Sequence, residues 1–178
     1  MNKSPQEVLK DIKSKNLAPI YIIHGDEPYF IDLLTDSFEA NVLDESEKGF
    51  NQFIFYGKDQ TLAAILSNAL RFPMMAERQV ILVKEASFLE SIGKGKSDTK
   101  DKGIDDLKLW EEYLKNPMPS TLLVFTVKTA LTDKAKIFSS IKNQAVVVSS
   151  PKVKEDKVAA WLKDYLSQNG LQINPETL

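Results

Sequence analysis

The chain has 178 residues, of which 43% are apolar, a formal net charge of −2 and no cysteine. This length and apolar content suit one folded domain, or one domain and the start of another, and exclude a disordered chain. The near-neutral charge gives no general attraction to nucleic acid or anionic membranes, and the lack of cysteine excludes disulfides, thiolate zinc sites and thiol catalysis.

The N-terminal segment predicts a helix followed by a buried strand. Residues 4–7, Ser-Pro-Gln-Glu, have the pattern of a capping box with proline at the first helical position. Residues 20–23, Ile-Tyr-Ile-Ile, are apolar throughout, which is typical of a parallel strand covered on both faces. The polar N-terminus shows no signal peptide, and no apolar run approaches the ~20 residues that span a bilayer. We therefore expect a cytoplasmic protein without membrane contacts.

The turn after this strand lies where many α/β proteins hold a nucleotide. A phosphate-binding loop there needs several glycines, a lysine and a hydroxyl group. Gly25 is followed instead by two carboxylates, Asp26 and Glu27, which repel phosphate, and by Pro28, which has no amide to donate. We interpret residues 25–28 as a degenerate nucleotide loop, in which Asp26 is the expected N-cap of the next helix.

Strands and helices then alternate as far as residue 150. Continuous apolar runs predict further strands at residues 53–56, 80–83, 122–127 and 145–148. Apolar residues at helical spacing predict helices through residues 30–38, 62–69, 104–114 and 137–141. Asp59 is the expected cap of the second of these helices. The alternation predicts an α/β fold with a doubly wound, mostly parallel five-stranded sheet and helices on both faces.

Residues 151–178 interrupt the alternation. A Ser-Ser-Pro sequence at 149–151 precedes a long amphipathic helix through Trp161 and Tyr165, with Gly170 as its expected end. Asn-Pro-Glu at 174–176 indicates the start of another helix close to the last residue. We therefore expect residues 1–150 to form one domain and residues 151–178 to begin a second, helical domain in a truncated chain.

The polar residues give no strong signal for catalysis or metal binding. His24, the one histidine, has no cysteine or serine partner at a recognisable spacing, so a hydrogen bond to the backbone is the favoured interpretation. No carboxylate cluster has the spacing of a metal site. Between residues 93 and 103, the lysines are interrupted by Asp98 and Asp101 and lack aromatic neighbours, which favours a solvated loop over a nucleic-acid contact. We expect no catalytic residue, metal or cofactor.

The segment from residue 70 to 79 is unusually apolar for a connection between a helix and a strand. Phe72, Met74 and Met75 cluster around Pro73. Exposed apolar clusters mark interaction sites, and methionine side chains adapt well to a partner surface. The same side chains would equally suit the core under the sheet, so composition leaves both alternatives open.

Several stretches, in this order and spacing, resemble the delta subunit of the bacterial DNA polymerase III clamp loader. Residues 18–30 are similar to the family's opening strand with its Gly-Asp-Glu-Pro turn, and residues 72–81 to its apolar pair followed by Arg-Gln and a strand. Residues 122–134 resemble a later strand and its lysine-bearing turn, and residues 161–173 the start of the family's second domain. The resemblance covers nearly the whole chain and the front half of the family's length.

The resemblance implies an AAA+ type of fold. It would comprise a RecA-like domain at residues 1–150 without a functional P-loop and a helical lid that begins at residues 151–178. The resemblance also implies a role without catalysis in the DNA polymerase III holoenzyme, in bacterial DNA replication. The family binds the ring-shaped sliding clamp, or beta subunit, and opens the ring for loading on DNA, while ATPase subunits supply the energy.

The resemblance assigns the clamp-binding residues as well. The family's two apolar residues that enter a hydrophobic pocket of the clamp fall at Met74 and Met75, where leucine and phenylalanine are common. Leu70 and Phe72 would support or widen the contact. Further implied partners are the delta prime and tau/gamma subunits, with DNA contacted indirectly or weakly. Two alternative hypotheses are an ATP-binding ATPase subunit of the same fold and a DNA-binding module that uses the lysine-rich loop.

Overall fold

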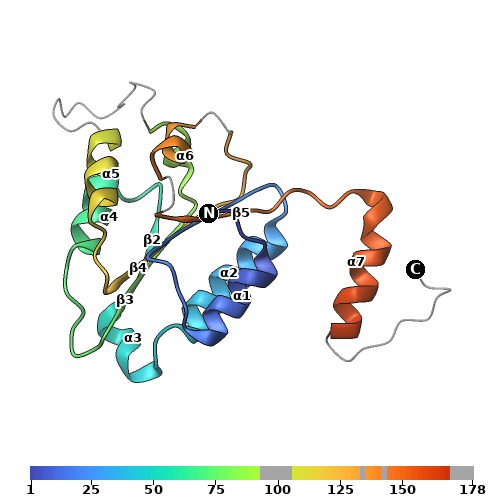
Figure 1. Cartoon of the computed structure of the whole chain (residues 1–178), viewed down its shortest axis with the longest axis horizontal. Coiled ribbons are helices and arrows are strands. Elements are labelled where there is room, and N and C mark those ends of the chain that lie inside the picture. The colour runs from blue at the N-terminus through green and yellow to red at the C-terminus, as the bar shows by residue number, and fades with distance from the viewer. Residues whose placement is uncertain (93–105, 133–134, 142–143, 169–178) are drawn as a thin grey trace.

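Five parallel strands form the centre of the computed structural model, which describes residues 1–92, 106–132, 135–141 and 144–168 (Figure 1). In chain order the strands are β1 (Ile20–His24), β2 (Gln52–Tyr56), β3 (Gln79–Lys84), β4 (Thr121–Val127) and β5 (Val146–Ser149). Their spatial order is β2-β3-β4-β1-β5, and neighbouring strands are all parallel. Each of the five was predicted to within one residue at either end, because strands covered on both faces are continuous apolar runs.

Helices cover both faces of this sheet, as predicted. They are α1 (Pro5–Ser14), α2 (Pro28–Asn41), α4 (Leu62–Ala69), α5 (Asp106–Lys115) and α6 (Lys136–Ile141). Successive residues of a strand point to opposite faces. Tyr21 and Ile23 of β1 therefore pack with α1 and α2, whereas Ile20 and Ile22 pack with α4, α5 and α6.

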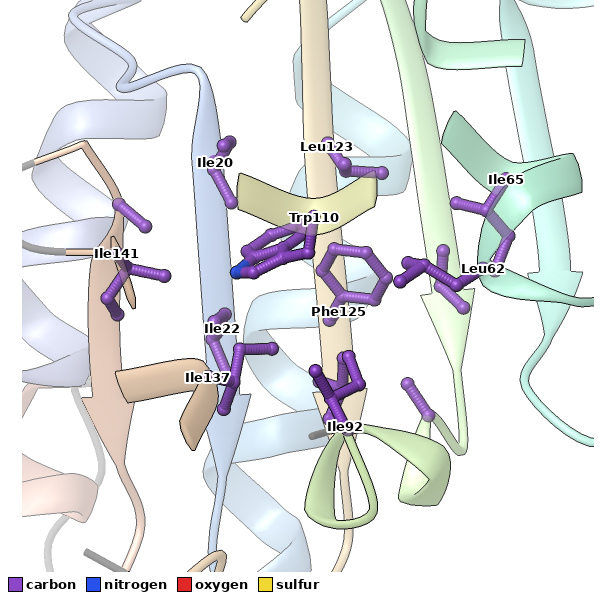
Figure 2. Close-up of a cluster of buried hydrophobic side chains, with 14 of the residues drawn as sticks. Ile20, Ile22, Leu62, Ile65, Ile92, Trp110, Leu123, Phe125, Ile137 and Ile141 are labelled. Carbon is purple, nitrogen blue, oxygen red and sulfur yellow. The ribbon is translucent and has the colours of Figure 1, made fainter. Parts of the chain in front are cut away.

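The face that carries α4, α5 and α6 holds a large aromatic pair at its centre. Figure 2 shows Trp110 of α5 beside Phe125 of β4, and their ring centroids are 5.8 Å apart. Trp110 is fully buried, and its Nε1 donates a hydrogen bond of 3.0 Å to the Ser140 hydroxyl on α6. The ring thus contributes a large apolar area while its polar atom stays satisfied.

Two short helices have no counterpart in the sequence-based prediction, namely α3 (Glu45–Asn51) and the 3-10 helix η1 (Ser87–Glu90). The backbone N–H of Asp44 donates to Glu47 at 3.2 Å, in the manner of a capping box, at the start of α3. The large apolar residue of α3, Phe50, is 66% exposed. A helix without an apolar stripe leaves no periodic signal in the sequence.

Two of the expected helix caps are wrong by one or two residues. Glu27, and not Asp26, caps α2, because the Glu27 carboxylate accepts from the backbone N–H of Tyr29 at 3.3 Å. Thr61, and not Asp59, caps α4. A cap is the last residue before the helical turn, so its identity depends on where the backbone enters the helix and not on side-chain type alone.

The last described helix, α7 (Glu155–Gln168), stands apart from the sheet in Figure 1. It meets the start of α2 through aromatic rings: Trp161 and Tyr165 lie 5.4 and 5.8 Å from the ring of Tyr29. The expected helix end at Gly170 and the expected helix at 174–176 lie outside the described residues. The division of the chain into domains at residue 150 stays a prediction. Among the described residues, no helix is long and apolar enough to cross a membrane.

Candidate functional site

The turn at residues 25–28 joins the carboxyl ends of three strands, which is the edge where open parallel sheets bind ligands. Gly25 has a φ of 148°, and its N–H donates to Val127 at the end of β4 and to Thr129. A Cβ on Gly25 would lie 2.0 Å from the carbonyl oxygen of Ser150, the residue that follows β5. The backbone of Ser150 therefore occupies the space beside Gly25, and only glycine fits there.

The Gly25, Glu27 and Tyr29 amides at this turn are already used by the chain itself. The N–H of Glu27 donates to the Ser150 carbonyl at 3.0 Å, and the N–H of Tyr29 donates to the Glu27 side chain. Pro28 has no N–H, and Asp26 points a carboxylate oxygen at the N–H of Ala130, 3.1 Å away. Phosphate binding at a helix N-terminus uses free N–H groups and is disfavoured by neighbouring carboxylates. The described geometry therefore supports the interpretation of residues 25–28 as a degenerate loop.

His24, at the end of β1, has the structural role that was favoured from the sequence. It is 7% exposed, and its Nδ1 accepts a hydrogen bond from the backbone N–H of Leu131 at 3.1 Å. Its ring lies 5.3 Å from that of Phe138 on α6. Because Nδ1 accepts a hydrogen bond, it carries no proton, and the proton of the neutral ring is on Nε2. The same hydrogen bond links β1 to the segment that follows β4.

The apolar segment after α4 is on the surface and is not part of the core. The exposed fractions of Leu70, Phe72, Met74 and Met75 are 52%, 82%, 58% and 100%. The alternative that these side chains pack under the sheet is therefore wrong. Leu70 is the C-cap of α4, so the methionines follow the end of that helix and precede β3. Four exposed large apolar side chains within six residues form a patch of the kind that marks a partner site.

Two buried amide side chains hold the backbone of this segment, and sequence reasoning assigned no role to either. Asn51, 1% exposed, accepts from the Met74 N–H at 2.6 Å and donates to the Met74 carbonyl at 2.9 Å. Gln79, 2% exposed, donates to the carbonyl of Arg71 at 2.6 Å and to the Thr121 hydroxyl at 2.8 Å. Gln79 belongs to the Arg-Gln motif that carries the resemblance, whereas no local signal connects Asn51 with Met74.

Comparison with known proteins identifies the family. The family model described as DNA polymerase III, delta subunit, matches residues 21–150. The chain belongs to this delta subunit family. Subunit delta of DNA polymerase III from Bacillus subtilis is 26% identical over 145 residues, which are 81% of this chain and 40% of that relative. This delta family chain thus spans less than half the length of its curated relative.

Solved structures confirm the expected fold class for this delta family chain. The DNA clamp loader delta protein of Bacillus subtilis superposes with a TM-score of 0.76 at 22% identity, over 97% of this chain and 50% of that one. A gamma subunit-related protein of DNA polymerase III from Thermotoga maritima gives a TM-score of 0.52 at 12% identity, over 93% of this chain and 52% of that one. The fold is a doubly wound, five-stranded α/β fold that these clamp loader proteins share.

Other candidate sites of the delta family chain have less support from the structure. The lysine-rich loop at residues 93–103 lies outside the described residues. Within the part of the chain that the structure describes, no group of three or more histidine, aspartate or glutamate side chains is placed to hold a metal ion. The candidate functional site is therefore the exposed segment of Leu70, Phe72, Met74 and Met75, here called the methionine loop.

Proposed function

We propose that the chain is the front part of a clamp loader delta subunit that binds the sliding (beta) clamp through its methionine loop and opens the ring. The observation that carries the proposal is Met75, whose side chain is 100% exposed next to the half-exposed Met74. Family membership supplies the setting, bacterial DNA replication within the DNA polymerase III holoenzyme. The protein acts in the cytoplasm, where that complex works.

Exposed apolar side chains have a physical reason to enter a pocket. Each square ångström of apolar surface removed from water contributes roughly 25 cal/mol, and a few buried anchors dominate most interfaces. Met74 and Met75 are the two anchors, and Leu70 and Phe72 widen the contact. A subunit that binds the open ring more tightly than the closed ring shifts the clamp toward opening by this difference in affinity alone. No chemistry by this chain is needed.

The turn at residues 25–28 supports a role without ATP hydrolysis. Its Gly25 and Glu27 amides are bonded to the chain itself, and two carboxylates stand where phosphate would bind. Energy for loading then comes from the tau/gamma subunits, with delta prime as a further partner. DNA is contacted indirectly or weakly, which fits the formal net charge of −2.

The proposal is tested by measuring binding of the sliding clamp to Met74→Asp/Met75→Asp. Two charges that cannot be desolvated in an apolar pocket are expected to raise the Kd roughly a hundredfold or more. Tyr56→Asp is the matched control: Tyr56 is 42% exposed but lies at the end of β2 that is remote from Asn51. Unchanged binding by the double variant would reject the site assignment. Fluorophores placed across one clamp interface report ring opening in the same samples.

A further inference from the structure

A buried side chain fixes the backbone beneath the exposed methionines. We propose that Asn51 is a positioning residue for clamp binding: it holds the main chain of Met74 so that Met74 and Met75 are presented in one geometry before the partner arrives. This inference rests on the function proposed above. It adds that the affinity of the methionine loop depends on a residue that the partner does not touch.

The bonding of Asn51 is two-sided. Its Oδ1 accepts from the Met74 N–H at 2.6 Å, while its Nδ2 donates to the Met74 carbonyl at 2.9 Å and to the Glu47 carbonyl at 3.2 Å. One side-chain amide thus pairs with both main-chain groups of a single residue, 23 positions away. Asn51 is 1% exposed, so an unmade bond would leave a buried polar group without water. These bonds are therefore expected to persist although the loop is on the surface.

The methionine loop needs such an anchor. Its large side chains are between half and fully exposed, so packing restrains the backbone less than it would in the core. Met75 has a φ of 53°, in the left-handed region that a residue with a Cβ rarely adopts. The bonds to Met74 hold the chain directly before it, and the bond from the Gln79 side chain to the Arg71 carbonyl closes the loop that contains it. The left-handed residue thus lies directly after a backbone position held by Asn51, within a loop closed by Gln79.

A fixed backbone with flexible side chains has a direct consequence for binding. Ordering a loop upon association costs conformational entropy, whereas a loop ordered on folding avoids that cost. If the bonds of Asn51 are lost, the binding-competent geometry becomes one of several, and the apparent Kd rises as its population falls. The methionine side chains, with three rotatable bonds each, still adapt to the pocket.

The test is a double-mutant cycle on clamp affinity. Four proteins are compared: the unchanged protein, Asn51→Ala, Met74→Ala/Met75→Ala and the triple variant. Asn51→Ala is expected to raise the Kd about tenfold, the result of a competent population near one tenth. In the background without the methionine side chains, the same change is expected to have almost no effect, because Asn51 acts through them. Hydrogen exchange should show a faster Met74 amide with unchanged β3 and β4 amides.

The outcomes separate this inference from the proposed function. If Met74→Ala/Met75→Ala binds as the unchanged protein does, the clamp site itself is misassigned. If that variant binds weakly but Asn51→Ala keeps the original Kd, or shifts it equally in both backgrounds, the positioning role is rejected and the site stands. Asn51→Asp is measured in parallel, since it has the same shape, keeps the acceptor for Met74 and loses the donor. Asn51→Asp takes the place of Asn51→Ala in the cycle if the alanine variant does not fold.

Discussion

At the scale of single residues, Gly25 shows how the protein's own backbone can require a glycine in a turn. Its φ of 148° and the Ser150 carbonyl beside it exclude any side chain. A glycine at this position in a sequence suggests close approach of a phosphate, but here the group that approaches is the protein's own backbone. The constraint on residue type is the same in both cases, because both need the space of a missing Cβ.

Gly25→Ala is expected to lower the free energy of unfolding by about 2–5 kcal/mol, from backbone strain and the clash with Ser150. Gly49→Ala is the matched control, since Gly49 lies in α3 and has nothing within 4 Å of an added Cβ. That change is expected to raise stability by roughly 0.5–1 kcal/mol through helix propensity. Urea unfolding measures both. Equal stabilities for the two variants would contradict the packing described around Gly25.

At the scale of elements, α7 and α2 are joined by aromatic side chains. The Trp161 and Tyr165 rings stack 5.5 Å apart, and both lie edge-on to Tyr29 in the first turn of α2. Burial, together with a hydrogen bond to Tyr165, raises the pKa of Tyr29 to about 12. The contact favours the neutral phenol of Tyr29. The contact between α7 and α2 is therefore expected to persist below pH 10 and to weaken only as the pH rises from 10 toward 12.

Trp161→Ala is expected to loosen α7 without affecting the sheet. Aromatic pairs of this kind contribute about 1 kcal/mol each, so amide exchange along α7 should accelerate severalfold. Val158→Ala on the same helix is the control, because Val158 is 42% exposed. Hydrogen exchange measured by mass spectrometry reports on α7 and α2 separately. Equal protection of α7 in both variants would show that the aromatic cluster does not hold the helix.

At the scale of the whole molecule, the turn at residues 25–28 and the methionine loop lie at opposite ends of one parallel sheet. The turn follows the carboxyl end of β1, whereas Gln79 and Thr121, which hold the loop, are the first residues of β3 and β4. All five strands are parallel, so the carboxyl end of β1 and the first residues of β3 and β4 lie at opposite ends of the sheet. The sheet thus separates the edge that holds nucleotides in related folds from the surface that we propose for the clamp.

Calorimetric titration with ATP and magnesium is expected to show no binding tighter than about millimolar. The reason is that the Gly25, Glu27 and Tyr29 amides already have acceptors in the chain. A tau/gamma subunit, measured under the same conditions, serves as the positive control. Micromolar binding would contradict the interpretation of residues 25–28 and would favour the alternative of an ATP-binding subunit.

The strands and the layers could be predicted from the sequence, and the interpretation of residues 25–28 as a degenerate loop also came from it. Buried parallel strands are continuous apolar runs, helices on a sheet are periodic, and the residue types at 25–28 differ from those of a phosphate-binding loop. These signals are local, so they can be followed along the chain. The family resemblance, confirmed by the match to residues 21–150, depends on the same local stretches.

The exposure of the methionines and the contact between Asn51 and Met74 could be known only from the three-dimensional fold. Apolar composition at residues 70–75 is the same for a buried and an exposed loop, and the side chains are on the surface because the chain passes outside the sheet there. The pairing of Asn51 with Met74 joins residues 23 positions apart. Its partner is main chain, which carries no sequence signal, so the contact exists only where the fold brings α3 and the methionine loop together.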